Sequence, residues 1–404
     1  MLLPFLRYNQ RFGMSVTTFQ EKLAAGGARL GMYRGAETPA DFGDSATEFQ
    51  ALLQGCALLD MSWQAKLVLA GEDRVRWMNG MVTNNVRDLA PGHGVYSFVL
   101  SAQGRIQGDL VAYNRGDYLL VTTDREQAPT IADIFDRYII MDDVEVADIS
   151  DKLAAIGVVG PISKSREILA AASLDVSQLE PGQVIDAVWR GVGVSVARSA
   201  QPQMDGFEIW FASENMDVIW DALVAAGLTP VGSNALELYR IVRGIPRFGV
   251  DLRERDLPQE TGQQHALNFT KGCYIGQEIV ERIRSRGNVH RVFTGFEVQG
   301  HPAAELPAPG TKVRANDKDA VSYTHLIPAA ICKRNARVGI RASARLPAAS
   351  SPDRFGYQHL HLPTRSQPTL CSPYRSYFFL VGAPRQQWSH LNYHYDGVAG
   401  PALS

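Results

Sequence analysis

The stretch Gly94–Asp124, GVYSFVLSAQGRIQGDLVAYNRGDYLLVTTD, is the clearest indicator of the fold class. Three runs within it are rich in apolar, β-branched and aromatic residues, which is typical of strands: Val95–Leu100, Gly108–Tyr113 and Tyr118–Thr123. The sequences SAQG and NRGD between these runs are typical of turns. We therefore predict three successive strands joined by hairpins, which favours an α+β fold over a doubly wound parallel sheet.

Helix and strand patterns alternate on both sides of this stretch, up to about residue 320. The segment FQEKLAAGGARLGMY predicts a helix ended by glycines, and DSATEFQALLQGCALLD predicts another with Asp44 or Ser45 as its N-cap. Further helices are expected in DRVRWMNG, QAPTIADIFDRYII, SKSREILAAAS, MDVIWDALVAAGL and SNALELYRIVRG, and further strands in KLVLAG, LAAIGVVG, GVGVSVARS, FEIWFAS and RVFTGFEVQG.

Composition is that of a globular chain, with 404 residues, 45% apolar residues and 20% charged residues. No apolar run reaches 18 residues, so we predict no transmembrane helix and no membrane partner. The four cysteines show neither C-x-x-C nor zinc spacing, which predicts free thiols in a reducing, cytoplasmic compartment. The first twenty residues lack acids, which leaves a mitochondrial presequence as the alternative to an upstream start with the folded chain beginning near Met14.

The composition changes abruptly near residue 320. Residues 321–404 hold nine Lys and Arg but only two acids, with no glutamate, and they contain eight of the 21 prolines. They show no helical or strand periodicity over a useful length. A basic tail that binds nucleic acid and a disordered native tail are two interpretations. We favour a third, in which the native frame is lost near Asp319–Ser322 and the tail is foreign or out-of-frame sequence without a function.

The segment FTKGCYIGQEIVERIRSRG, residues 269–287, carries the most unusual chemistry. Its isoleucines fall four residues apart, and Glu278 precedes Arg282 by four, so it predicts a helix ending at Gly287. Cys273 would then lie at or just before the helix N-terminus, beside Lys271, and both surroundings lower a thiol pKa. A reactive or metal-touching thiol is one interpretation, and a buried structural cysteine is the other.

Two resemblances follow from these residues. KGCYIGQE with RIRSRGNVHR resembles the signature of the YgfZ family of folate-binding proteins, which act in iron–sulfur cluster assembly or maintenance. Residues 20–320 also resemble the wider aminomethyltransferase (glycine cleavage T-protein) superfamily, through segments such as QGRIQGDLVAY, DGFEIWF and GIPRFGVDLRERDLPQE. The resemblance implies two α+β domains around a central folate cavity and a C-terminal β-barrel domain, here truncated or replaced.

The resemblance also implies folate contacts. Glu208 is similar to a glutamate of the superfamily that can accept two N–H donors from a pterin ring. Arg240 resembles a helix arginine suited to the glutamyl carboxylate of folate. Tyr239 could flank the pterin with Phe248, although aromatic residues at such positions are more often core. Asn84 resembles part of a turn near the cavity, and Lys271 belongs to the cysteine signature.

Asp109 falls where the T-protein has a pair of aspartates, one of which is central to catalysis. The first position of that pair is Gly108 here, so the sequence retains only one carboxylate. This difference counts against aminomethyl transfer. We interpret it as a folate scaffold put to another use.

Three functions stay open at this point. The first is a protein that binds tetrahydrofolate or a derivative and acts in iron–sulfur cluster assembly, indirectly supporting tRNA modification. Its Cys273 would be a transient cluster ligand, with assembly or client proteins as partners, because one thiolate cannot hold a cluster that needs about four ligands. The second is a tetrahydrofolate-dependent aminomethyl or one-carbon transferase that depends on Asp109. The third is a binding module with a buried cysteine, and direct nucleic-acid binding is not expected from the acidic residues 1–320.

The same patterns predict the domain organisation. We expect an N-terminal extension at 1–20, a folate-binding domain at 21–150, a second domain with the KGCYIGQE segment at 151–288, the start of a β-barrel domain at 289–320 and the foreign tail at 321–404.

Overall fold

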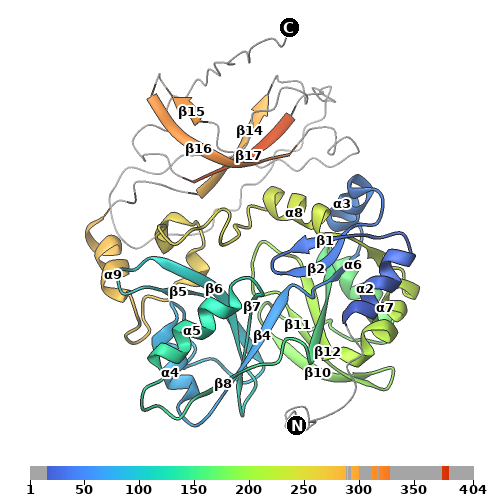
Figure 1. The fold of residues 1–404 in the computed structure, drawn as a ribbon, viewed down its shortest axis with the longest axis horizontal. Helices are drawn as coiled ribbons and strands as arrows, with labels where there is room; N and C mark the ends of the chain where they lie inside the picture. The colour runs from blue at the N-terminus through green and yellow to red at the C-terminus, as the bar shows by residue number, and fades with distance from the viewer. Residues whose placement is uncertain are drawn as a thin grey trace. The chain divides into compact units, whose positions relative to one another are not determined.

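The computed structural model describes residues 16–287, 289, 293–299, 312–315, 318–327 and 375–381 (Figure 1). These residues belong to two compact units, one up to Val289 and the other from His290 onward. Both helices and antiparallel sheets are present, so the predicted α+β class is confirmed.

A five-stranded antiparallel sheet, which we call the first sheet, holds the stretch that indicated the fold class. Its order is β5-β6-β7-β4-β8, and the three predicted strands are neighbours in it. The helices α4 and α5 contribute Trp77 and Phe135 to its core, where the two rings meet edge to face at 5.2 Å. The elements of this part are β4 (Gln64–Ala70), α4 (Arg74–Met81), β5 (His93–Leu100), β6 (Ile106–Asn114), β7 (Leu119–Asp124), α5 (Ala128–Tyr138) and β8 (Glu145–Asp148).

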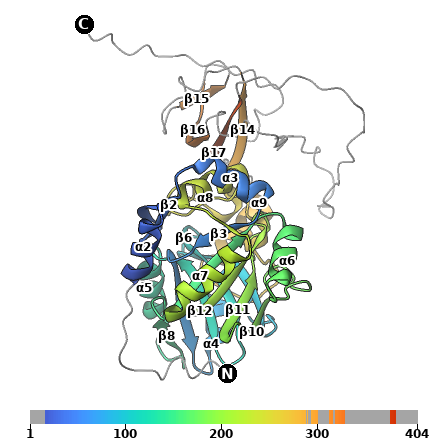
Figure 2. The same ribbon diagram turned by 90° about the vertical axis from the view of Figure 1, so that its right-hand side faces the viewer.

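A six-stranded sheet, the second sheet, has the order β10-β11-β12-β9-β3-β13, and only its β13–β3 pair is parallel. The helices α2, α6 and α7 cover it, and α7 lies in front of β11 and β12 in Figure 2. Its elements are α2 (Val16–Ala25), β3 (Ala57–Asp60), β9 (Leu153–Val159), α6 (Ile162–Ala171), β10 (Val184–Trp189), β11 (Val192–Arg198), β12 (Gly206–Ala212), η1 (Ser213–Asn215), α7 (Met216–Ala225) and β13 (Thr229–Pro230).

A tight hairpin that the sequence analysis did not predict follows α2. Strands β1 (Arg29–Tyr33) and β2 (Ala36–Asp41) pair so that Tyr33 faces Ala36 across a two-residue turn. Arg34 and Gly35 both have positive φ angles, of 48° and 88°, as the favoured type I′ turn requires. The helix that follows, α3 (Ser45–Gln54), begins as predicted, because the Asp44 side chain accepts a hydrogen bond from the backbone N–H of Ala46 at 3.0 Å.

The chain returns to the first sheet after α8 (Ser233–Val242). The backbone N–H of Ile106 donates to the carbonyl of Asp256 at 3.1 Å, and the hydroxyl of Thr83 donates to the carbonyl of Ala266 at 2.6 Å. The elements of this returning segment are η2 (Pro258–Glu260), η3 (Gln264–Ala266) and α9 (Gln277–Arg286). The KGCYIGQE segment therefore packs on the first sheet, although it follows the strands of the second sheet in the sequence.

The second unit contains one antiparallel sheet of order β14-β17-β16-β15 among its described residues. Its strands are β14 (Phe293–Gln299), β15 (Lys312–Ala315), β16 (Lys318–Ile327) and β17 (Arg375–Val381). Strand β17 lies in the stretch expected to be foreign, and most of that stretch lies outside the described residues. Its origin therefore stays a prediction. Across the described part of the chain, no helix is long and apolar enough to span a membrane.

Candidate functional site

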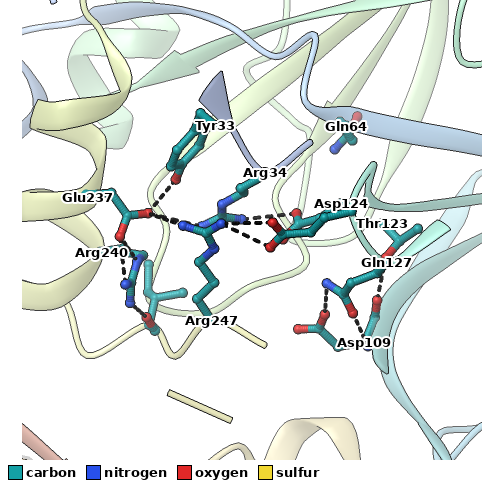
Figure 3. A network of polar contacts seen from close by, with 12 residues as sticks. Tyr33, Arg34, Gln64, Asp109, Thr123, Asp124, Gln127, Glu237, Arg240 and Arg247 are labelled. Atoms are coloured by element: carbon teal, nitrogen blue, oxygen red, sulfur yellow. Dashed lines mark hydrogen bonds and ion pairs between the residues drawn. The ribbon is translucent and has the colours of Figure 1, made fainter. Parts of the chain in front are cut away.

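Asp109 lies on β6 in a network of polar contacts (Figure 3). One carboxyl oxygen accepts from the Tyr96 hydroxyl at 2.6 Å, and the other accepts from the Gln127 amide at 2.9 Å. Gln127 also accepts from the backbone N–H of Asp109 at 3.0 Å, so it fixes both the backbone and the side chain. Burial, and then the negative charge of Asp124, raise the pKa of Asp109. Asp109 as a whole residue is only partly buried.

Strand register places two more polar side chains beside Asp109. Val111 faces Thr122 in the β6–β7 pair, so continuing that register by two residues sets Asp109 opposite Asp124. Gln64 faces Asp124 in the neighbouring β4–β7 pair. Residues that face each other across antiparallel strands share one face of the sheet. The three side chains therefore form a row across β6, β7 and β4.

Glu208 extends this row to the second sheet. One of its carboxylate oxygens, Oε2, accepts from the Gln64 amide at 2.9 Å and from the indole N–H of Trp210 at 3.0 Å. The amide oxygen of Gln64 is buried and has no hydrogen-bond partner among the described residues. Gln64 thus bonds Glu208 of the second sheet and faces Asp124 of β7, the strand next to the one that carries Asp109.

Arg34 reaches into the network from the turn of the β1–β2 hairpin. Its guanidinium donates to Asp124 at 3.2 Å and lies over the rings of Tyr33 and Trp63, 5.0 and 4.7 Å from their centroids. Asp124 raises the pKa of Arg34 against the opposing effect of burial, so Arg34 remains charged. The positive φ angle of Arg34 is a strained conformation for a residue with a long side chain.

A second charged cluster surrounds Glu237 of α8. Glu237 accepts from Tyr33 at 2.7 Å and pairs with Arg240 at 2.7 Å and with Arg247 at 3.6 Å. Burial alone would raise the pKa of Glu237, but Arg240 and Arg34 outweigh it and lower this pKa to about 2. The Arg247 guanidinium also lies over the Tyr33 ring, 5.2 Å from its centroid. The cluster is thus ionised and holds the hairpin against α8.

Three of the predicted folate contacts lie inside the protein with partners of their own. Arg240 is 1% exposed and is bound by Glu237 and by Asp251, the latter at 2.6 Å. The Asn84 amide donates to the carbonyls of Tyr96 and His265 at 2.9 and 2.7 Å. Tyr239 is buried in α8 beneath the guanidinium of Arg243. In these positions the three side chains contact other parts of the protein and stabilise the fold.

Lys271 and Cys273 occupy contrasting positions in one loop. The Lys271 ammonium is 6% exposed and donates to the carbonyls of Asn79, Val82 and Asn84 at 2.5, 2.5 and 2.7 Å, so it closes the end of α4. Burial lowers the pKa of Lys271 to about 7. Cys273 is exposed, so the alternative of a buried structural cysteine is wrong.

The helix after Cys273 starts later than the sequence analysis predicted. Its first residue is Gln277, and its N-cap is Gly276, so the thiol is four residues before the helix, whereas it was expected at or just before the N-terminus. The cause is the turn at Gly276, whose φ is 81° and where a Cβ atom would lie 2.6 Å from the carbonyl oxygen of Ser101. The predicted pair of Glu278 and Arg282 is confirmed, at 2.6 Å.

The residues that surround Asp109 were not predicted from the sequence. Gln127 and Asp124 are separated from it by a strand and a turn, and Arg34 comes from a hairpin about 75 residues earlier in the chain. The dipeptide Arg34–Gly35 between MY and AE was the available turn signal. Among the described residues, no group of three or more His, Cys, Asp or Glu side chains is arranged to hold a metal ion.

Comparison with known proteins shows the family. The family described as the GCVT N-terminal domain matches residues 19–271, and the chain belongs to this family. An aminomethyltransferase of Rubrobacter xylanophilus is 28% identical over 289 residues, which cover 71% of this chain and 77% of that protein. An aminomethyltransferase of Caldanaerobacter subterraneus subsp. tengcongensis is 28% identical over 310 residues, with 73% and 79% covered.

A solved structure shows a similar fold. The glycine cleavage system aminomethyltransferase T from Bartonella henselae superposes with a TM-score of 0.66 at 18% identity, and the match covers 76% of this chain and 84% of that one. The expectation of a T-protein-like α+β fold is therefore confirmed. The narrower resemblance to YgfZ stays a prediction.

Proposed function

We propose that this protein transfers an aminomethyl or related one-carbon group to tetrahydrofolate, with Asp109 as the acid–base group. The observation that carries the proposal is the setting of the Asp109 carboxyl, which two donors orient and whose pKa is raised. An acid–base group works best when its pKa is shifted toward the pH at which the protein operates. The proposal also agrees with the names of the related proteins, which are aminomethyltransferases.

The residues beside Asp109 suit the pterin end of a folate. A pterin ring presents adjacent N–H donors, and these need acceptors. Glu208 receives both of its hydrogen bonds on Oε2, which leaves its Oε1 without a hydrogen bond from the described residues. The buried amide oxygen of Gln64 is also without a partner in the described part of the chain. Two neighbouring acceptors thus match the donor pattern of the ring.

The division of work within this site follows from these contacts. Tetrahydrofolate would supply the two nitrogens that carry the one-carbon unit. Glu208 and Gln64 would bind the pterin ring and fix its orientation. Asp109 would pass a proton to the departing amine or thiol of the donor and take one back from a folate nitrogen. Ammonia and the free thiol or amine would leave as the carbon bonds to the two nitrogens, while Tyr96 and Gln127 fix the orientation of the carboxyl. Arg240, Asn84, Tyr239 and Lys271 enter the proposal as residues that order the elements around the ligand.

A second candidate function rests on Cys273. The thiol is exposed although its neighbour Lys271 is anchored inside the protein. A thiol presented on an anchored loop suits contact with another molecule, such as an iron–sulfur client or assembly protein. In that function, folate would bind at the same Glu208 side of the site, and Cys273 would be a transient ligand of the cluster.

One assay separates the two candidates. The full chain is incubated with tetrahydrofolate and ¹³C-labelled aminomethyl amines and thioethers, and labelled methylenetetrahydrofolate is measured by mass spectrometry. Aminomethyl transfer predicts product with the wild-type protein and with Cys273→Ala. The absence of product from every donor, or equal loss of product in Cys273→Ala and Asp109→Asn, would overturn the first proposal and favour the second.

A further inference from the structure

A side chain at position 108, where the second carboxylate is missing, would crowd Gln127 and Ile131. A Cβ atom on Gly108 would lie 3.1 Å from the amide oxygen of Gln127 and 3.2 Å from Cδ1 of Ile131. Gln127 is 4% exposed and is held there by its two hydrogen bonds to Asp109. The Gln127 side chain therefore occupies the space beside position 108, next to Asp109.

Asp124 brings a second carboxylate to the same site from the next strand. Continuing the β6–β7 register two residues past the Val111–Thr122 pair places it opposite Asp109, and the Thr123 hydroxyl beside it donates to the Asp109 carbonyl at 2.8 Å. Asp124 is 7% exposed, so its charge acts through protein rather than through bulk water. The two-carboxylate arrangement is thus present in the fold, although the two carboxylates are not adjacent in the sequence.

Arg34 neutralises this second carboxylate from a fixed position. The two-residue turn restrains its backbone, and the rings of Tyr33 and Trp63 restrain its guanidinium. Figure 3 shows Arg34 between Glu237 on one side and Asp124 on the other. A strained residue in a restrained position often has a functional role, because the strain has a cost in stability.

We propose that Asp124 and Arg34 form a charge pair that determines the pH range in which Asp109 carries a proton. Asp124 would take the place of the carboxylate that is missing at position 108. Both are positioning residues, and the inference rests on the proposed acid–base role of Asp109. The negative charge of Asp124 favours the protonated form of Asp109, and the positive charge of Arg34 favours the ionised form.

The other groups that face Asp109 are the same in the wild-type protein and in the variants described below. Tyr96 from β5 and Gln127 at the start of α5 donate to its two oxygens. His265 of η3 stacks on the Tyr96 ring at 5.4 Å, and burial lowers its pKa to about 4, so it is neutral near pH 7. The substitutions below therefore change only the charges of Asp124 and Arg34 that act on the Asp109 carboxyl.

The test uses two substitutions with opposite expected signs in the full chain. Asp124→Asn removes the negative charge and lowers the pKa of Asp109 by about one unit, whereas Arg34→Gln raises it by about one unit. Arg34→Lys keeps the charge and restores most of the wild-type value. The pKa is followed in the pH profile of aminomethyl transfer and, independently, in the infrared band of the protonated carboxyl that Asp109→Asn abolishes. Arg76→Gln, a surface arginine paired with Asp73 and Asp142, serves as the control.

The infrared titration keeps this inference separate from the proposed function. Opposite shifts in folded Asp124→Asn and Arg34→Gln support the charge pair, whether or not the protein transfers a one-carbon group. No transfer in any variant overturns the proposed function alone. Shifts of the same sign, or lower activity with an unchanged carboxyl titration, would mean that Asp124 and Arg34 only hold the fold together, and would overturn the inference.

Discussion

The Asp109 carboxyl and the Cys273 thiol lie in opposite surroundings. Asp109 is enclosed by Tyr96, Gln127 and Asp124, and both of its carboxyl oxygens accept hydrogen bonds. Cys273 is exposed, and the nearby Lys271 ammonium is bound by three backbone carbonyls instead of facing the thiol. The surroundings of the carboxyl fix its orientation and shift its pKa, whereas the thiol is exposed to solvent and to other molecules. The difference is the basis for the proposed roles, proton transfer by Asp109 and contact with a partner by Cys273.

The largest expected effect comes from removing the carboxyl. Asp109→Asn keeps the size of the side chain but cannot exchange a proton, so we expect one-carbon transfer to fall by roughly 10²–10⁴-fold. Single-turnover measurement of labelled product gives the rate. Cys273→Ala should transfer at the wild-type rate, and a loss of similar size in that variant would erase the distinction between the two regions.

The next effect concerns the stability of the network that holds the hairpin. Arg240→Met leaves Glu237 and Asp251 without the buried guanidinium between them, so we expect the free energy of unfolding to fall by about 3–5 kcal/mol. Urea denaturation measures this change. Arg282→Met, which removes an exposed pair with Glu278, is the matched control and should cost about 0–1 kcal/mol. Equal losses in the two variants would contradict the structural role given to Arg240.

A smaller effect is expected at the anchor of the cysteine loop. Lys271→Met leaves three carbonyls at the end of α4 without their donor, which should cost about 1–3 kcal/mol. The variant should also change the rate at which a thiol reagent labels Cys273, because the loop loses its attachment. Unchanged stability and unchanged labelling would show that the loop is held by other contacts.

The smallest expected effect is a pH dependence from His265. Burial lowers its folded-state pKa to about 4, below the value of about 6.5 in an unfolded chain. The unfolded chain therefore binds the extra proton first, and stability declines as the pH falls from about 6.5 toward 4. His265→Gln should flatten this part of the stability curve, as measured by urea denaturation at a series of pH values. A curve that keeps its full slope would assign the acid sensitivity to other groups.

The sequence predicted the local elements well, because their signals are local. The alternating runs of Gly94–Asp124 became β5, β6 and β7, and the cap at Asp44 began α3 as expected. The hairpin Arg29–Asp41 was missed because a short strand pair with a turn at Arg34 has little periodicity of its own. Strand β13 pairs with β3 across about 170 residues of sequence, and no local pattern specifies such a partner.

The site was predicted in part for the same reason. Asp109 and Glu208 could be chosen because their segments resemble those of a known family. Gln64, Asp124 and Arg34 could not, since strand register and one turn bring them to the site. The resemblance also placed Arg240 in contact with a ligand, whereas the structure surrounds it with two acidic partners that the sequence alone does not reveal.

The most direct test of the folate site is a calorimetric titration of the full chain with tetrahydrofolate. We predict binding by the wild-type protein, at least a tenfold weaker affinity for Glu208→Gln because the pterin ring loses its carboxylate acceptor, and nearly unchanged affinity for Asp109→Asn. Absence of binding by the wild-type protein, or equal affinity in the wild-type protein and Glu208→Gln, would contradict the proposed folate site at Glu208.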